Sequence, residues 1–186
     1  MKTLDDRIES YRKMNVAARK NAVVCFGSTY LADMNISEFV TDSALGVPVY
    51  SRSFDGLHIA DAEHAATAVC ELNPSKLVVN IGDEDVRSRN FDVEEFCANY
   101  EWLLLELHRN CPGCKLYVMS IVSDKPNAVK ANAALEKLAK NTGCRFINVP
   151  VPEGGSDSAL RVFNAVRPYL RPFPVTFADA MQYPAV

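Results

Sequence analysis

The segment Ala22-Val23-Val24-Cys25-Phe26-Gly27-Ser28-Thr29 is an apolar run that stops at a glycine and two hydroxyl-bearing residues. A second segment repeats this pattern, because Leu77-Val78-Val79-Asn80-Ile81 runs into Gly82-Asp83-Glu84-Asp85. Short apolar runs of this kind are typical of strands that are buried on both faces of a parallel sheet. In open α/β sheets, ligands bind where such strands end. We therefore expect the functional site at Gly27–Thr29 and Gly82–Asp85.

Apolar runs and helical patterns alternate along the rest of the chain. The spacing predicts strands at 22–26, 47–50, 76–81, 115–122 and 145–149, and helices at 4–18, 36–44, 59–72, 93–109, 127–141 and 157–170. This alternation predicts a three-layer α/β/α domain, flavodoxin-like, with a five-stranded parallel sheet in the order 2-1-3-4-5. Strands one and three are neighbours in that order. The two glycine-containing turns should therefore flank one crevice, with Arg52, Ser53 and Gly56 beside it.

Length and composition fit a single globular domain over residues 1–186, with a helix inside 1–20 and an irregular tail at 171–186. The net charge of −3 does not favour nucleic acid as a partner. No apolar run approaches the roughly 18 residues that span a membrane, and residues 1–20 lack the apolar core of a signal peptide. Cys25, Cys70, Cys97 and Cys144 lie in apolar surroundings, as free thiols do, so we expect a cytoplasmic protein.

Two further patterns resemble metal sites, and the sequence favours neither as one. Cys111-Pro112-Gly113-Cys114 has the spacing of a metal or redox pair, but it follows a helix and precedes a strand, so we predict a turn. Asp83-Glu84-Asp85 carries the oxygen ligands that Mg²⁺ prefers, yet three adjacent residues cannot all point at one ion. No phosphate-binding glycine motif follows a strand, so we expect neither a metal nor a nucleotide cofactor.

Residues 22–170 resemble the SGNH hydrolases, also called GDSL esterases, in the order of their sequence blocks. The family's Gly-Asp-Ser block corresponds to Gly27-Ser28-Thr29, which puts Thr29 in the place of the nucleophilic serine. The family's Asn-Arg-Gly-x-x-Gly block resembles 51–56, with Ser53 in the place of the first glycine and Gly56 in the place of the second.

The two later blocks of the family also have counterparts here. The Gly-x-Asn-Asp block resembles Gly82–Asp85, with Glu84 in the place of the asparagine that donates to the oxyanion. The Asp-x-x-His block would fall at Glu153–Leu160, where no histidine occurs. The resemblance implies hydrolysis of acyl or acetyl esters. It also implies a crevice for a small molecule, lined by Gly27, Ser28, Arg52, Ser53, Gly56, Gly82, Glu84 and Asp85.

The substitutions weaken the catalytic part of this expectation. A threonine hydroxyl is more hindered than that of serine and needs a base beside it. The last histidine of the chain is His108, so the base would have to be His58 or the carboxylate of Asp157. An ionised Glu84 is an acceptor only and would repel an oxyanion.

Three interpretations therefore stay open. The chain is a binding protein on a decayed hydrolase site, a hydrolase that uses Thr29 with His58 or Asp157, or an interaction protein that uses the tail at 171–186. Association into a homo-oligomer is compatible with each of them.

Overall fold

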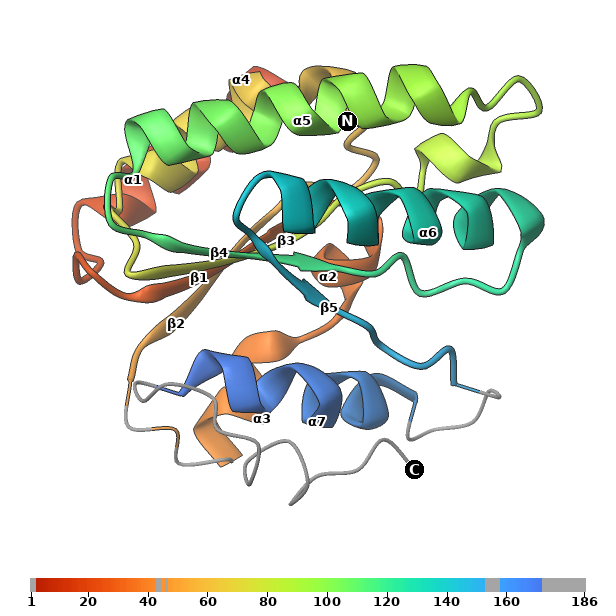
Figure 1. Cartoon of the computed structure of the whole chain (residues 1–186). Helices are drawn as coiled ribbons and strands as arrows, with labels where there is room; N and C mark the ends of the chain where they lie inside the picture. The colour runs from red at the N-terminus through yellow and green to blue at the C-terminus, as the bar shows by residue number, and fades with distance from the viewer. Residues whose placement is uncertain (1–2, 43–44, 46, 153–157, 172–186) are drawn as a thin grey trace.

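The apolar runs form one five-stranded parallel sheet in the order β2-β1-β3-β4-β5, which confirms the predicted order (Figure 1). The computed structural model describes residues 3–42, 45, 47–152 and 158–171. The strands are β1 Val23–Gly27, β2 Val49–Ser53, β3 Lys76–Asn80, β4 Lys115–Met119 and β5 Arg145–Ile147. The helices are α1 Leu4–Asn15, α2 Thr29–Asp33, α3 Ile36–Asp42, α4 Ala62–Cys70, α5 Val93–Asn110, α6 Pro126–Asn141 and α7 Ser158–Leu170, with single 3-10 turns η1 Ile59–Asp61 and η2 Asp85–Arg87.

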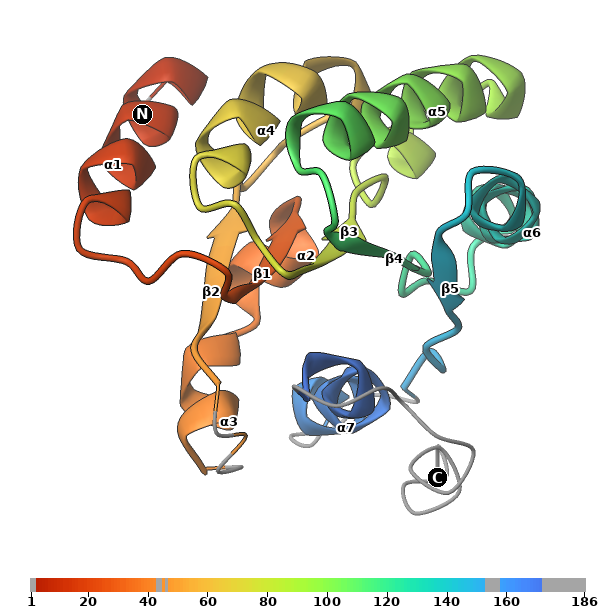
Figure 2. The same ribbon diagram turned by 60° about the vertical axis from the view of Figure 1, so that its left-hand side comes forward.

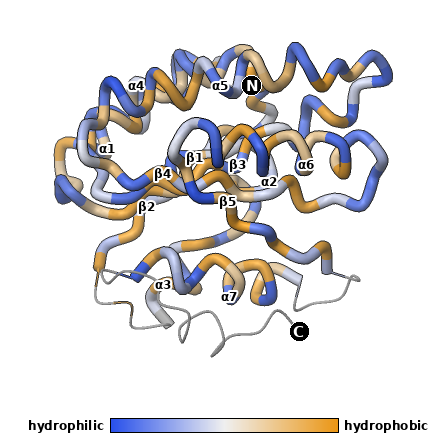
Figure 3. Tube along the Cα trace, viewed as in Figure 1, coloured by the Kyte–Doolittle hydropathy of each residue, from blue (hydrophilic) through white to orange (hydrophobic). Residues whose placement is uncertain are grey.

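Both faces of the sheet are covered, as the apolar strands require. Side chains alternate along a strand, so Val24 and Phe26 of β1 join the core under α1, α4, α5 and α6. Val23 and Cys25 of the same strand join the core on the other face, with α3 and α7. Figure 2 shows these two groups of helices on opposite sides of the sheet, and Figure 3 shows that hydrophobic residues concentrate along the strands. The architecture is a three-layer α/β/α sandwich.

Local signals explain where the two best-marked helices begin. Thr3 caps α1 through a reciprocal pair of hydrogen bonds with Asp6, the capping-box arrangement. Asp92 caps α5, and its carboxylate accepts hydrogen bonds from the backbone N–H groups of Glu94 and Glu95. Within the described residues, no helix is both long enough and apolar enough to cross a membrane.

Several predicted boundaries were wrong by a few residues. The second strand lies later than predicted, at Val49–Ser53 rather than 47–50, because pairing with β1 continues through its polar residues. The helix α2 was not predicted, because its five residues are too few to show a helical spacing of apolar residues in the sequence. The first helix ends at Asn15 rather than at residue 18, and the strands β4 and β5 end at Met119 and Ile147. The loop at 153–156 and the tail at 172–186 lie outside the described residues.

The Cys111–Cys114 segment is a turn, as predicted. The backbone N–H of Cys114 donates to the carbonyl oxygen of Cys111 at 3.1 Å. Gly113 lies inside this turn with a φ of +81°, a value that a glycine reaches without steric cost. All six cysteines are free thiols.

Candidate functional site

The carboxyl ends of three neighbouring strands bring the expected segments together. In the sheet register, Gly27 at the end of β1 pairs with Ser53 of β2 and with Asn80 of β3. The contact continues beyond the strands, because the N–H of Ser28 donates to the carbonyl oxygen of Asn80 at 3.0 Å and the N–H of Phe54 donates to that of Gly27 at 2.8 Å. The turns after β1, β2 and β3 therefore form one site.

Thr29, which the family resemblance puts in the place of the nucleophile, is hydrogen-bonded on both sides. Its hydroxyl donates to Glu84 Oε1 at 2.6 Å, and its oxygen accepts the backbone N–H of Gly56 at 2.8 Å. Glu84 is in turn paired with Arg87, whose Nη1 lies 2.8 and 3.0 Å from the two carboxylate oxygens. The result is a chain of contacts that links the loops after all three strands.

The residues on either side of Thr29 are also engaged with the protein. The Ser28 side chain is fully buried and donates its hydroxyl to the carbonyl oxygen of Leu57 at 2.7 Å. The N–H of Tyr30 donates to Asp83 Oδ2 at 2.8 Å, while the buried Oδ1 of Asp83 has no hydrogen-bond partner. Burial raises the pKa of Asp83, and the Tyr30 N–H and the nearby Ser28 hydroxyl reduce the effect.

His58, considered as a substitute base, is paired with Asp85 rather than with Thr29. Its Nδ1 lies 3.3 Å from Asp85 Oδ1, and more than half of its side-chain surface is exposed. Asp85 also accepts the backbone N–H of Ile59, at 3.2 Å from Oδ2, and burial raises the pKa of its carboxyl group. The polar partners of the Thr29 hydroxyl are Gly56 and Glu84, so His58 is not hydrogen-bonded to it, and a role of His58 as a base stays a prediction.

Arg52 does not line the site, which corrects the expectation from sequence. Its Nε donates to Asn15 Oδ1 at 2.9 Å, and its guanidinium lies over the rings of Tyr11 and Tyr50 at 5.1 and 5.4 Å from their centroids. The physical reason is the longer β2: since Arg52 lies inside the strand, alternation turns its side chain toward α1. Its role is structural.

The remaining predicted residues belong to the scaffold of the site. Ser53 is buried, its hydroxyl accepts from that of Ser51 at 3.3 Å, and its carbonyl oxygen accepts from the Tyr11 hydroxyl. Gly82 has a φ of +126°, and a Cβ there would lie 2.8 Å from the side chains of Phe96 and Ile121. Asp157 lies outside the described residues.

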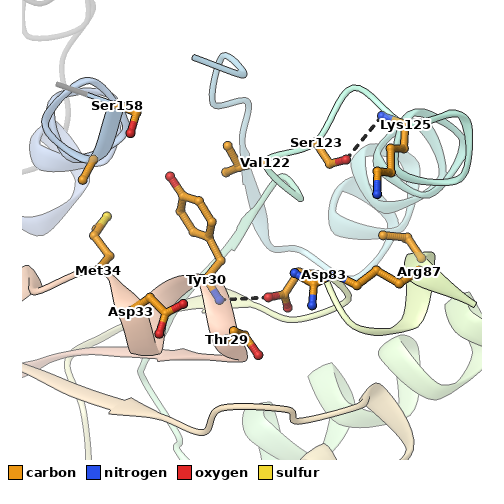
Figure 4. Close-up of a pocket in the computed structure, with 12 residues that line it drawn as sticks. Thr29, Tyr30, Asp33, Met34, Asp83, Arg87, Val122, Ser123, Lys125 and Ser158 are labelled. Carbon is orange, nitrogen blue, oxygen red and sulfur yellow. Dashed lines mark hydrogen bonds between the residues drawn. The ribbon is translucent and has the colours of Figure 1, made fainter. Parts of the chain in front are cut away.

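A cleft of about 440 Å³ opens beside Thr29 (Figure 4). It is lined by Thr29, Tyr30, Asp33, Met34, Asp83, Val86, Arg87, Val122, Ser123, Lys125, Ser158 and Ala159. Figure 4 shows Lys125 and Ser123 on the side opposite to Asp33 and Met34, with Tyr30 and Asp83 between them. Of these residues, the sequence motifs indicated only Thr29 and the Gly82–Asp85 turn, although the polar residues after β4 also lie at the end of a strand.

Two charged groups of this cleft have no partner among the described residues. In the part of the chain that the structure describes, neither the carboxylate of Asp33 nor the ammonium of Lys125 has a hydrogen-bond or ion-pair partner. Arg87, by contrast, is paired with Glu84. Among the described residues, no three side chains of His, Cys, Asp or Glu are arranged to hold a metal ion.

Comparisons with known proteins show which solved structures share this fold. No protein-family model and no curated protein matches the chain. Among solved structures, a Streptococcus pneumoniae protein described provisionally as a platelet activating factor superposes with a TM-score of 0.72, at 17% identity over 90% of this chain and 92% of that one. The protein TesA superposes with a TM-score of 0.65, at 15% identity over 81% and 98% of the two chains.

A GDSL-like lipase from Bacteroides thetaiotaomicron gives a TM-score of 0.60, at 18% identity over 81% of this chain and 82% of that one. Sequence identities this low support a shared fold but not a shared activity. The superpositions and the strand order agree with the resemblance seen in the strand-end motifs. The chain therefore has the fold of the SGNH hydrolases.

Proposed function

We propose that this protein binds a small ligand in the cleft beside Thr29 and does not hydrolyse esters by the serine–histidine mechanism of its fold. The observation that carries this proposal is the double engagement of the Thr29 hydroxyl. Its proton is donated to Glu84 at 2.6 Å and its oxygen accepts the Gly56 N–H at 2.8 Å. An attacking hydroxyl needs a base that takes its proton and a free path to the ester carbon, and here both sides of the oxygen are held by the protein.

Two backbone N–H groups beside Thr29 that could donate to an oxyanion are occupied as well. The Gly56 N–H donates to Thr29 itself, and the Tyr30 N–H donates to Asp83. Removing one such donor typically slows an acyl-transfer enzyme by roughly 10² to 10³. The Glu84 carboxylate beside them adds a negative charge where a negative charge would have to develop.

A second candidate function rests on the Thr29–Glu84 contact. A carboxylate at 2.6 Å is within reach of the hydroxyl proton, so a threonine-dependent hydrolase with Glu84 as base is the alternative. Arg87 works against it, because its guanidinium already contacts both oxygens of the Glu84 carboxylate, at 2.8 and 3.0 Å.

An ester-hydrolysis assay separates the two functions. We expect p-nitrophenyl acetate to be hydrolysed by the wild-type protein no faster than by the Thr29→Ala variant at equal concentration. Turnover that is present in the wild type and lost in Thr29→Ala would establish the threonine-dependent hydrolase instead. Thr41→Ala, which removes an exposed hydroxyl of α3, controls for background reaction.

The charges of the cleft indicate what kind of ligand it takes. Asp33 offers a carboxylate on one side and Lys125 offers an ammonium on the other, and among the described residues neither group has a partner. A ligand that carries both a cationic and an anionic group satisfies both sides. We therefore propose a small zwitterion, whose ammonium faces Asp33 and whose anionic group faces Lys125.

Three probes of similar length test this ligand class by calorimetry: γ-aminobutyrate, butyrate and butylamine. We expect the zwitterion to bind at least tenfold more tightly than either singly charged probe. Lys125→Met should reduce the affinity for γ-aminobutyrate to that for butylamine, whereas Lys130→Met on the exposed side of α6 should leave it unchanged. Equal affinity for all three probes would refute the zwitterion. It would leave the absence of hydrolysis, which the ester assay decides, unaffected.

A further inference from the structure

Basic side chains line another surface cleft, at the end of the sheet opposite to Thr29. This basic cleft has a volume of about 350 Å³. Lys115 is the first residue of β4 and Arg145 is the first residue of β5, so both lie at the amino ends of neighbouring strands. His108 reaches the cleft from the last turn of α5. The other residues that line it are Cys114, Leu116, Tyr117 and Gly143.

The positive charges of the basic cleft are not neutralised by carboxylates. No aspartate or glutamate occurs among the described residues that line it. In the part of the chain that the structure describes, the Lys115 ammonium and the Arg145 guanidinium form neither an ion pair nor a hydrogen bond. The whole chain has a net charge of −3, so this gathering of cations is local. A concave site lined by one sign of charge attracts ligands of the opposite sign.

Lys76 on β3 adds to the positive potential beside the cleft. It pairs with Lys115 in the register of the sheet. The Lys76 side chain is buried, and its ammonium donates to the carbonyl oxygen of Tyr169 in α7 at 3.0 Å. Burial and the neighbouring Lys115 cation lower the pKa of Lys76. Lys76 is thus held by the protein, and Lys115 is the one of the two that can meet an anion from solution.

Contacts with the protein hold the other two basic groups in place. The Arg145 guanidinium lies over the ring of Tyr169, 5.4 Å from its centroid. His108 Nδ1 lies 2.9 Å from the carbonyl oxygen of Leu104. A carbonyl oxygen can only accept, so Nδ1 carries a hydrogen and Nε2 is the ring nitrogen that remains for a ligand. Side chains that are already positioned lose less entropy when a ligand binds.

We propose that the basic cleft binds a small phosphate monoester. Such an ester carries about 1.5 to 2 negative charges at pH 7 and three acceptor oxygens, which match the two cations and the histidine. The planar guanidinium of Arg145 can donate two parallel hydrogen bonds to phosphate, and the Lys115 ammonium acts as a point charge. A carboxylate has one charge and two oxygens, so it would leave one cation unpaired. The organic part of the ester lies against Leu116 and Tyr117.

Calorimetric titration at neutral pH and low ionic strength tests the charge of the ligand with three compounds: phenyl phosphate, phenyl sulfate and phenol. Phenyl sulfate keeps the tetrahedral shape of the phosphate but carries one negative charge, and phenol carries none. We expect phenyl phosphate to bind at least about fivefold more tightly than phenyl sulfate, because the second charge faces a second cation. Phenol should not bind detectably. Equal affinity for the two esters, or no binding of either, would overturn the proposal.

Substitutions locate the site. Lys115→Met and Arg145→Met should each weaken the binding of phenyl phosphate by about five- to tenfold, because each removes a charged partner. Arg145→Lys keeps the charge and should recover part of the affinity. Lys130→Met, on the exposed side of α6, removes the same charge elsewhere and should leave the affinity unchanged. Loss of binding in Lys125→Met, with Lys115→Met unaffected, would assign the phosphate to the cleft beside Thr29 and overturn the proposal.

Arg145→Met also loses the contact with Tyr169, so its fold must be checked by circular dichroism. If this variant is unstable, Lys115→Met decides the question, because the Lys115 side chain is exposed.

Phosphate monoesters occur in soluble small molecules and in the lipid phosphatidic acid, and vesicle sedimentation separates these two sources. The site is a cleft of limited volume rather than a flat face, which favours a soluble ligand. We therefore expect the protein to stay in the supernatant with phosphatidylcholine vesicles that contain phosphatidic acid. Sedimentation with these vesicles, without binding of phenyl phosphate, would overturn the assignment to a small soluble ester.

Discussion

Replacing Thr29 with valine tests whether this residue holds the site together or does chemistry in it. Valine keeps the shape and the β-branch of threonine and removes only the hydroxyl, so the two hydrogen bonds to Gly56 and Glu84 are lost. The bond from Gly56 is neutral and solvent-exposed, and contributes about 0.5 kcal/mol. The bond to Glu84 is charge-assisted, but the carboxylate keeps Arg87, so about 1 kcal/mol is lost there. Together the free energy of unfolding should fall by about 1.5 kcal/mol.

Urea unfolding measures this change, and the midpoint of thermal unfolding should fall by about 3–6 °C for a chain of this length. Thr41→Val is the matched control, since the Thr41 hydroxyl only donates to the carbonyl oxygen of Ser37 within α3. Its effect should stay within about 0.5 kcal/mol. Groups kept for catalysis are commonly strained, and removing them often stabilises a protein. A Thr29→Val variant that is more stable than the wild type would therefore refute the structural role argued here.

Two further predictions concern the same site. Gly27→Ala should lower the free energy of unfolding by about 3 kcal/mol in urea titration, because its Cβ would lie 2.6 Å from the backbone oxygen of Asn80. Gly143→Ala is the control: its φ of +73° strains an alanine but the space around it is open, so the loss should be only about 1 kcal/mol. Equal losses in the two variants would contradict the packing argument. Asp83→Asn should stabilise the protein near pH 7, because burial raises the folded-state pKa of Asp83 and the folded protein then binds its proton more tightly than the unfolded chain. The wild-type protein therefore loses stability as the pH rises from about 4 through the folded-state pKa of Asp83. The stability advantage of Asp83→Asn over the wild type should vanish below about pH 4. An advantage that grows toward acid pH would contradict the raised pKa.

The sheet could be predicted from sequence because its signal is local. Each of the strands β1 and β3 is a nearly continuous apolar run, and only a sheet covered on both faces buries such a run. The order of the strands then followed from general rules of topology, without any knowledge of particular contacts.

The direction in which the Arg52 side chain points was not predicted, because the strand that contains it ends later than expected. With a strand at 47–50, Arg52 falls in a loop at the edge of the crevice. With the observed β2 at Val49–Ser53, the same residue lies inside the strand and is turned toward Asn15 and Tyr11. A change of three residues in a boundary thus moved a charged side chain from the site to the packing of α1.

The partners of Thr29 could not be predicted either, because they come from different loops. Gly56 and Glu84 are 27 and 55 residues away in sequence, and their contacts depend on the conformations of the turns after β2 and β3. The sequence indicated that Glu84 would oppose an oxyanion. It did not indicate that Glu84 would accept the proton of the very hydroxyl in the nucleophile position.

The motif glycines explain why the fold can persist whether or not the activity does. A Cβ at Gly27 would meet the backbone oxygen of Asn80, and a Cβ at Gly82 would meet Phe96 and Ile121 while its φ of +126° would strain any other residue. Both glycines are therefore required by the packing of the strand ends, whether or not any ester is hydrolysed beside them. Nothing in the packing requires a serine at position 29 or an amide at position 84, since threonine and glutamate there complete a stable set of hydrogen bonds. The part of the motif that a sequence comparison detects most readily thus reports the fold, and only the polar side chains between the glycines report the chemistry.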